Sequence, residues 1–239
     1  MNSPKLGWPI RTLVHNDVKN PCSFELPRSR PLGRSFFRRD PATVARELLG
    51  CAMLHCCDGE WLGGWIVETE AYLAEGDPAC HAARGRGRSN ASMFEPAGTL
   101  YVYPIHAKHC VNLVTENAGV GSAVLIRAIE PVWGIDAMMQ NRNVSDLRRV
   151  TSGPGMICSA MGIDRASDAM DVTRADDWLL TGGHQVADRV TQTPRIGVSR
   201  AADLRLRFFV DGNRFVSGLA REHTRPRRDV LGPDKDPSR

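Results

Sequence analysis

Five segments rich in aliphatic, aromatic and β-branched residues follow one another between residues 52 and 131, with turn residues between them. Segments of this length and composition are typical of β-strands, and Asp58-Gly59 after the first is a hairpin turn signal. A run of consecutive strands of this kind favours a largely antiparallel sheet. The segments are AMLHCC (52–57), WLGGWIVETEAYL (61–73), TLYVYPI (99–105), CVNLVT (110–115) and AVLIRAIEP (123–131). Gly63-Gly64 predicts a bulge or bend in the longest of them.

A helix signal precedes the first of these segments. Asp40 is suited to the N-cap and Pro41 to the first helical position. Val44 and Leu48 belong to an apolar stripe, and Gly50 marks the end of the helix.

The remaining segments complete the predicted order of elements. Helices are expected over 134–142 and 152–163, and an excursion without regular structure over 75–98. A looped or disordered stretch follows the second helix, and RIGV (195–198) and LRLRFFV (204–210) are predicted as late strands. Consecutive strands with helices at the flanks indicate an α+β fold with one largely antiparallel sheet.

The 239 residues are about the size of one large domain. Residues 1–35 carry five prolines and six basic residues against two acidic ones, so we expect an irregular basic N-terminal arm. The domain is expected over 36–218, with a flexible tail over 219–239. No stretch free of charged residues approaches the roughly 20 that span a membrane. Seven cysteines, an odd number without a CxxC pair, favour reduced thiols and a cytoplasmic location.

The densest polar cluster on an otherwise apolar segment is Glu68, Glu70 and Tyr72. Alternate residues of a strand share a face, so these side chains would point the same way, about 6.5–7 Å apart. Such a pair of carboxylates suits a general base beside a second or structural carboxylate. A polar strand edge that faces solvent explains the pattern as well, and strand geometry does not say which glutamate would act.

Histidine and tyrosine side chains gather further along the chain. They combine flat π faces with polar tips and could form a slot for a planar ligand. They could also be ordinary core residues. His106, His109 and Cys110 offer three zinc donors, but their spacing matches no standard structural zinc site, and no metal is expected. The aromatic set is His81, Tyr101, Tyr103, His106 and His109.

The charge balance is only weakly informative about partners. The net charge is +4, too small by itself to indicate nucleic-acid binding. The basic arm and the run RGRGR (84–88) would suit phosphate contacts, which supply most non-specific affinity for DNA. Solvated segments explain these charges equally well.

Six motifs occur in a fixed order along the chain. Each is a weak signal alone, but together they make the region from Phe36 to Val216 resemble the alkyladenine (3-methyladenine) DNA glycosylase family. The late RIG and the RF of RLRFF extend the resemblance. The six are VETEAY (67–72), the histidine nine residues after Tyr72, MFEPAGTLYVY (93–103), Asn112, VLIRAIEP (124–131) and SGPG (152–155).

The resemblance implies a fold and a reaction. The family's fold is a single mixed domain with a curved antiparallel sheet. Its members flip a damaged purine out of duplex DNA and hydrolyse the N-glycosidic bond, leaving an abasic site without a metal or redox cofactor. We therefore expect a hydrolase of base excision repair that acts as a monomer on double-stranded DNA with alkylated or deaminated purines. It would be associated with the nucleoid in a bacterium or located in the nucleus of a eukaryote.

The resemblance also implies roles for individual residues. Glu70 would be the general base that deprotonates the attacking water, and Arg127 would help to hold Glu70 and that water. Glu68 would be structural. Asn112 would line the pocket and discriminate against normal guanine. The flipped base would lie between the rings of Tyr72, His81 and Tyr103.

Two departures from the family pattern concern contacts with DNA. The tyrosine-glycine turn that wedges into the duplex is replaced by PIHAKHCVN, one residue shorter, with His106 as the wedge candidate and Ile105 as its alternative. The lysine of the family's SGP-x-K segment is Met156 here. Lys108 could compensate for that lysine, as could Arg84, Arg86 and Arg88 of the basic run.

Three functions remain open at this point. The first is an active glycosylase, and the second is a damaged-DNA-binding protein whose altered wedge has cost it turnover. The third is a metal-dependent hydrolase built on the glutamates, His81 and the 106–110 cluster. The sequence does not indicate which damaged purine would be preferred.

Overall fold

The computed structural model describes residues 26–27 and 29–218. Most of the predicted basic arm (1–35) and all of the predicted tail (219–239) lie outside these residues. At the start of the described part, the backbone amide of Leu32 donates to the carbonyl of Leu180 at 2.8 Å, and Pro31 bridges to Thr181. The end of the predicted arm therefore lies against the edge of the sheet.

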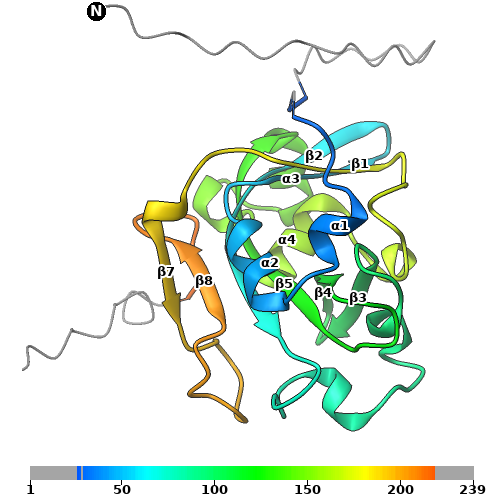
Figure 1. Ribbon diagram of the computed structural model, residues 1–239. Coiled ribbons are helices and arrows are strands. Elements are labelled where there is room, and N and C mark those ends of the chain that lie inside the picture. The colour runs from blue at the N-terminus through cyan, green and yellow to red at the C-terminus, as the bar shows by residue number, and fades with distance from the viewer. Residues whose placement is uncertain (1–25, 28, 219–239) are drawn as a thin grey trace, which may run out of the picture.

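Among the described residues, one sheet of eight strands organises the fold (Figure 1). Its main path runs β3-β4-β5-β2-β1-β6, and β8 joins β2 to β7. Every strand pairing is antiparallel, which confirms the α+β prediction. The strands are β1 Ala52–Cys57, β2 Glu60–Tyr72, β3 Leu100–Ile105, β4 Lys108–Val114, β5 Ala123–Trp133, β6 Trp178–Thr181, β7 Val190–Thr193 and β8 Arg207–Val210.

The helices of the described residues are short, and each of the three predicted ones forms. They are α1 Arg34–Phe37, α2 Pro41–Glu47, α3 Ile135–Arg142 and α4 Pro154–Met161. The carboxylate of Asp40 caps α2 by accepting from the Thr43 amide at 2.7 Å, as its sequence indicates. Within the described ranges, none of these helices has the length and hydropathy of a membrane span. Single turns of 3-10 helix add His81–Arg84, Ala91–Phe94, Leu147–Arg149, Arg165–Ser167 and Ala187–Arg189.

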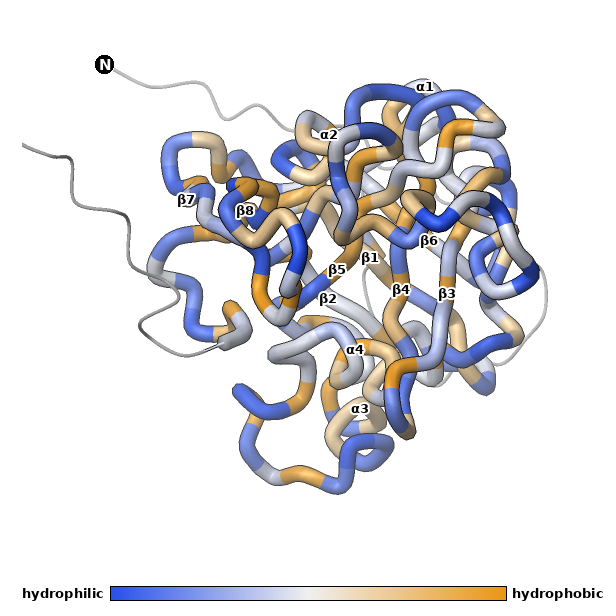
Figure 2. The backbone as a smooth tube through the Cα atoms, turned by 90° about the horizontal axis from the view of Figure 1, so that it is seen from below, coloured by the Kyte–Doolittle hydropathy of each residue, from blue (hydrophilic) through white to orange (hydrophobic). Residues whose placement is uncertain are grey.

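The main hydrophobic core lies where helices pack on the sheet. α2 packs on β2, where the Thr69 hydroxyl donates to the Ala45 carbonyl at 2.8 Å, and α4 packs on β4. Val111 and Ile126 lie in this core. Figure 2 shows hydrophobic residues along β1, β4 and β5 and hydrophilic residues in many of the surrounding loops.

β2 is irregular where it pairs with β5. The predicted disturbance at Gly63-Gly64 is confirmed, because the register with β5 shifts between these two residues. A Cβ at Gly64 would lie 1.8 Å from the carbonyl oxygen of Glu130, so only glycine allows this close approach. Further register shifts fall on either side of Glu68. Bulges of this kind bend a strand and redirect its side chains.

Two expectations for the late part of the chain are wrong. RIGV (195–198) is not a strand, because its backbone and side chains bind β2 and the loop after it instead of a neighbouring strand. The stretch expected to be looped contains β6, which pairs with β1, and β7, which pairs with β8. These strands have only four residues each, too few to establish a recognisable alternation.

Candidate active site

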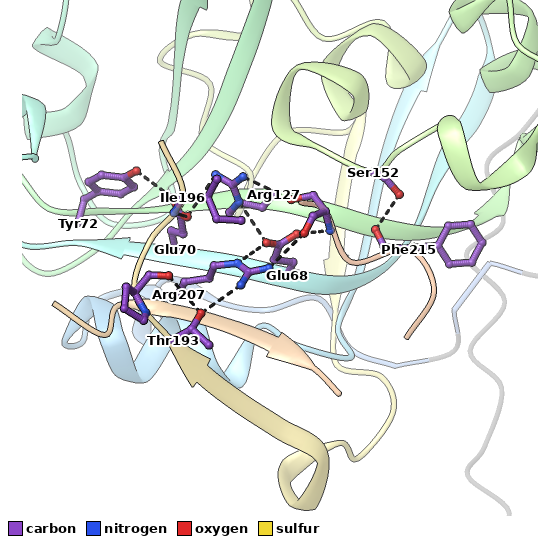
Figure 3. A network of polar contacts seen from close by, with 11 residues as sticks. Glu68, Glu70, Tyr72, Arg127, Ser152, Thr193, Ile196, Arg207 and Phe215 are labelled. Atoms are coloured by element: carbon purple, nitrogen blue, oxygen red, sulfur yellow. Dashed lines mark hydrogen bonds and ion pairs between the residues drawn. The ribbon is translucent and has the colours of Figure 1, made fainter. Parts of the chain in front are cut away.

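Glu70, near the end of β2, is the meeting point of three hydrogen-bond donors (Figure 3). Its Oε1 accepts from the backbone amide of Ile196 at 2.8 Å and lies 3.2 Å from Nη1 of Arg127. Its Oε2 accepts from the hydroxyl of Tyr72 at 2.9 Å. The side chain is fully buried, so the prediction of a solvent-facing strand edge is wrong. The donors fix both oxygens of the carboxylate in place.

Glu68 is held by a second and denser set of contacts. Its Oε1 lies 2.6 Å from Nε of Arg207 and 3.2 Å from Nε of Arg127, and its Oε2 accepts from the Ser217 amide at 2.7 Å. Glu68 and Arg207 are fully buried. Arg127 thus contacts both glutamates and offsets the repulsion between them (Figure 3). The arrangement makes Glu68 the anchor of a structural ion-pair network.

Burial and these partners shift the pKa values of the neighbouring groups. Burial opposes the charge of Arg127, but Glu70 and Glu68 outweigh it and raise the pKa of the guanidinium. Burial, and next the charge of Glu70, raises the pKa of Tyr72 far above its ordinary value. Tyr72 is therefore a neutral hydrogen-bond donor to Glu70 and cannot itself serve as a base near neutral pH.

Strand register brings Asn112 into the same row as Glu70. Tyr101 of β3 pairs with Asn112 of β4, Asn112 pairs with Leu125 of β5, and Leu125 pairs with Glu70 of β2. Directly opposed residues of neighbouring strands point to the same face. At about 4.8 Å per strand, Asn112 lies about 10 Å from Glu70 across this face. Its Nδ2 donates to the Tyr101 carbonyl at 2.9 Å.

His81, Tyr101 and Tyr103 form an aromatic group next to this row. The His81 and Tyr103 ring centroids are 4.7 Å apart, with an interplanar angle of 66°. Nδ1 of His81 is 2.6 Å from the Tyr101 hydroxyl, which fixes the imidazole. Burial, and next the positive charge of Arg84, lowers the pKa of His81. The ring is therefore neutral at neutral pH and presents an uncharged face to a ligand.

The β3–β4 connection holds both candidate wedge residues. Ile105 pairs with Lys108, and His106 has a left-handed backbone conformation with φ 51°. Ile105 is 42% exposed, and among the described residues it is the only large hydrophobic side chain that is exposed. Lys108 Nζ lies 3.4 Å from Sδ of Met156. The Lys108 ammonium is therefore next to the position at which the family has a lysine. The tip thus combines an apolar and a cationic side chain.

The arginines of the 84–88 run are exposed, but one is already engaged. Nη2 of Arg86 lies 3.0 Å from Oε1 of Glu95, and its guanidinium is 6.0 Å from the Phe94 ring. Arg84 and Arg88 are on the surface on either side of it. An exposed ion pair is weak, so Arg86 could exchange Glu95 for a phosphate.

A metal-dependent site does not assemble from these residues. In the part of the chain that the structure describes, no three His, Cys, Asp or Glu side chains are placed to hold a metal ion. His109 and Cys110 are neighbours on β4 and therefore point to opposite faces of the sheet, which separates two of the three predicted zinc donors.

Comparison with known proteins identifies the family to which this chain belongs. The profile of methylpurine-DNA glycosylase matches residues 35–214, which are three quarters of the chain and include Glu68, Glu70 and Arg207. The chain belongs to the methylpurine-DNA glycosylase family. This family consists of hydrolases that act on DNA and cleave the N-glycosyl bond, and the expected class of enzyme is therefore confirmed.

Several relatives of this methylpurine-DNA glycosylase family member are similar to it over most of their length. The protein is 58% identical over 209 residues to one from Rhodopirellula baltica, covering 85% of this chain and 90% of the relative. It is 44% identical over 197 residues to one from Methanoculleus marisnigri (78% and 98%) and 41% identical over 204 residues to one from Koribacter versatilis (81% and 98%). Each of the three is named "putative 3-methyladenine DNA glycosylase".

Sequence reasoning assigned no role to three residues that complete this candidate site. Arg207 stands beside Phe208 in a fully buried strand, and a buried arginine requires a carboxylate partner. That requirement could have paired it with Glu68. Arg195 and Ile196 lie in the RIG motif, which the resemblance included. Their contacts are with residues more than 110 positions earlier, a distance that no local pattern reports.

Proposed function

We propose that this protein is a monofunctional glycosylase that flips a damaged purine out of duplex DNA and hydrolyses its N-glycosidic bond with water activated by Glu70. The observation that supports the proposal most strongly is the buried Glu70 carboxylate, held by Arg127 and Ile196 beside the aromatic residue Tyr72. A fixed carboxylate next to a π surface suits a reaction in which a planar base departs and water attacks.

The two oxygens of Glu70 differ in what they can still accept. A carboxylate oxygen has room for two hydrogen bonds. Oε1 already has two donors, Arg127 and the Ile196 amide, whereas among the described residues Oε2 has only the Tyr72 hydroxyl. We infer that Oε2 takes the nucleophilic water and that Arg127 keeps the carboxylate turned toward it.

The reaction then proceeds by a simple exchange of bonds. The C1′–N bond breaks, and its electron pair leaves with the base. The water oxygen forms the new bond to C1′ while its proton passes to Glu70. Alkylation at N3 or N7 gives the purine a positive charge, so the departing base becomes neutral without protonation. The carboxylate also stabilises positive charge that develops on the sugar.

The aromatic group supplies recognition of the flipped base. We infer that the base stacks between Tyr72 on one side and His81 with Tyr103 on the other, and that Asn112 contacts its edge. A cationic purine is attracted to the electron-rich ring faces, and a damaged base costs less to unstack from the duplex. The exposed tip with Ile105 and His106 would fill the gap in the duplex, and Lys108, Arg84 and Arg88 would contact phosphates.

Release of free base from methylated DNA tests this proposal. The wild-type protein should release methylated purines and leave abasic sites that alkali converts to strand breaks. Glu70→Gln should reduce the single-turnover rate by about 10²–10⁴-fold, because it removes the proton acceptor while keeping the shape of the side chain. Binding to damaged duplex should be retained in this variant.

The alternative is a non-catalytic damaged-DNA-binding protein with a shortened wedge. It predicts tight and lesion-dependent binding by the wild type with no base released and no difference between the wild type and Glu70→Gln. That pattern would overturn the glycosylase proposal.

A further inference from the structure

Arg195 is a buried cation on the segment between β7 and β8, and it takes no part in the proposed reaction. The residue is 5% exposed. Its Nη1 and Nη2 bind Oδ2 and Oδ1 of Asp77 at 2.6 and 2.7 Å, and Nη1 also donates to the Ala71 carbonyl at 3.1 Å. Two parallel charge-assisted hydrogen bonds fix the plane of a guanidinium. The side chain is therefore immobilised against the end of β2 and the loop that follows it.

This fixed guanidinium lies directly against the candidate site. Its central carbon is 4.6 Å from the centroid of the Tyr72 ring, so the cation occupies one face of that ring. Only the opposite face is left for a stacked base. The next residue in the chain, Ile196, donates its backbone amide to Glu70. Arg195 thus adjoins both the Tyr72 ring and, through the next residue, one donor to the Glu70 carboxylate.

In this position the Arg195 guanidinium leaves one of its buried donors without a hydrogen bond. Within residues 26–27 and 29–218, Nε of Arg195 is buried without a hydrogen-bond partner, which costs free energy. The partner carboxylate remains ionised near neutral pH. Burial raises the pKa of Asp77, but hydrogen bonds from Arg195 and from the Leu73 and Ala79 amides outweigh it and hold that pKa below its ordinary value. The pair is therefore cation and anion.

We propose that Arg195 is a positioning residue for Tyr72 and the Ile196 amide, and that its charge weakens the preference of Tyr72 for cationic over neutral purines. The inference rests on the proposed glycosylase function. A cation is attracted to the negative face of an aromatic ring. A guanidinium already on one face repels a second cation on the other, and Asp77 partly neutralises this repulsion. A neutral purine is not affected in this way.

Single-turnover base release from two duplexes tests the inference. One duplex carries a single 7-methylguanine, whose base is cationic, and the other a single hypoxanthine, whose base is neutral. The readout is the ratio of the two rate constants, which does not depend on the fraction of folded enzyme in a preparation. Arg195→Met removes the charge, Asp77→Asn removes its compensation, and Arg195→Lys keeps the charge without the fork. Arg200→Met, an exposed arginine of the same segment, is the matched control.

The variants have opposite expected effects on the ratio. Arg195→Met should raise the 7-methylguanine to hypoxanthine ratio by about two- to fivefold, the range of an ordinary cation–π contribution. Asp77→Asn should lower it, and Arg195→Lys should leave it near the wild-type value. All three should slow release of both bases, whereas Arg200→Met should change neither the rates nor the ratio.

Parallel loss of both rates with an unchanged ratio in Arg195→Met and Asp77→Asn would overturn the inference and leave Arg195 as a structural residue. A wild-type protein that releases neither base would instead overturn the proposed function itself, and the inference with it. The two failures are distinguished by the wild-type measurement alone.

Discussion

The carboxylates of β2 and the tip of the β3–β4 connection lie on the same sheet but are held in different ways. Glu68 and Glu70 are fully buried and receive charged and backbone donors from β5, β8 and the segment before β8. Ile105 and His106 are exposed, and His106 has a left-handed backbone conformation. The carboxylate proposed to activate water is positioned by long-range contacts, whereas the tip proposed to enter DNA is left accessible for its partner.

Removal of the Glu68 charge should produce the largest effect on stability. Glu68→Gln leaves Arg207 and Arg127 without their common counter-charge in a buried setting. Breaking a buried pair in this way costs about 3–5 kcal/mol, measured as the loss in free energy of unfolding in urea. Glu47→Gln, which removes an exposed ion pair with Arg39, is the control and should cost less than about 1 kcal/mol. Equal losses in the two variants would show that burial does not make the Glu68 network more important to stability than an exposed ion pair.

Substitutions at the tip should affect excision while the fold remains as stable as before. Ile105→Ala and His106→Ala should each change the free energy of unfolding by less than about 0.5 kcal/mol, because both side chains are exposed. The variant that removes the wedge should slow excision from duplex DNA by about tenfold, equivalent to about 1.4 kcal/mol of lost support for the flipped state. Comparison of the two rates decides between Ile105 and His106. If neither rate falls, this tip does not enter the duplex.

The smallest expected effect concerns the titration of His81. Its pKa should lie below the ordinary value of about 6.5, since burial and next Arg84 disfavour the imidazolium. As the pH falls below about 6.5, the imidazole is therefore protonated in the unfolded chain before it is protonated in the folded protein. The stability contributed by neutral His81 should be lost as the pH falls from that value to the lower pKa of the folded protein. Arg84→Ala should raise the pKa of His81, as measured by the pH dependence of its imidazole NMR signals. An unchanged titration would show that the basic run does not reach the aromatic group.

The part of the site on β2 could be predicted from local pattern because its residues are close together in the sequence, whereas the roles of the other site residues came from the family resemblance. Glu70 and Tyr72 alternate on one strand, so a shared face follows from the period of two, and the contact between them bears this out. The prediction could not separate the roles of Glu68 and Glu70 by geometry. That difference comes from Arg207 and Ser217, whose sequence separation from Glu68 exceeds 130 residues.

The misassigned segment shows where local patterns stop being sufficient. RIGV (195–198) has the composition of a short strand, but Arg195 turns inward to Asp77 and the Ile196 amide donates to Glu70. A buried carboxylate competes for a backbone donor that a strand would otherwise use in a ladder. The sequence shows Glu70 and Ile196, but it does not show that the fold places them within hydrogen-bonding distance.

The sequence by itself determined the antiparallel order of strands, the capped helix at Asp40 and the cluster around Glu70, because turns, caps and alternation depend on neighbouring residues. Only the tertiary structure decided that Arg195 serves Asp77 and that Arg207 serves Glu68, since both arginines reach their partners across strands and loops. The physical reason is burial. An ion excluded from water must find its counter-ion wherever the fold brings one, and that choice belongs to the assembled sheet.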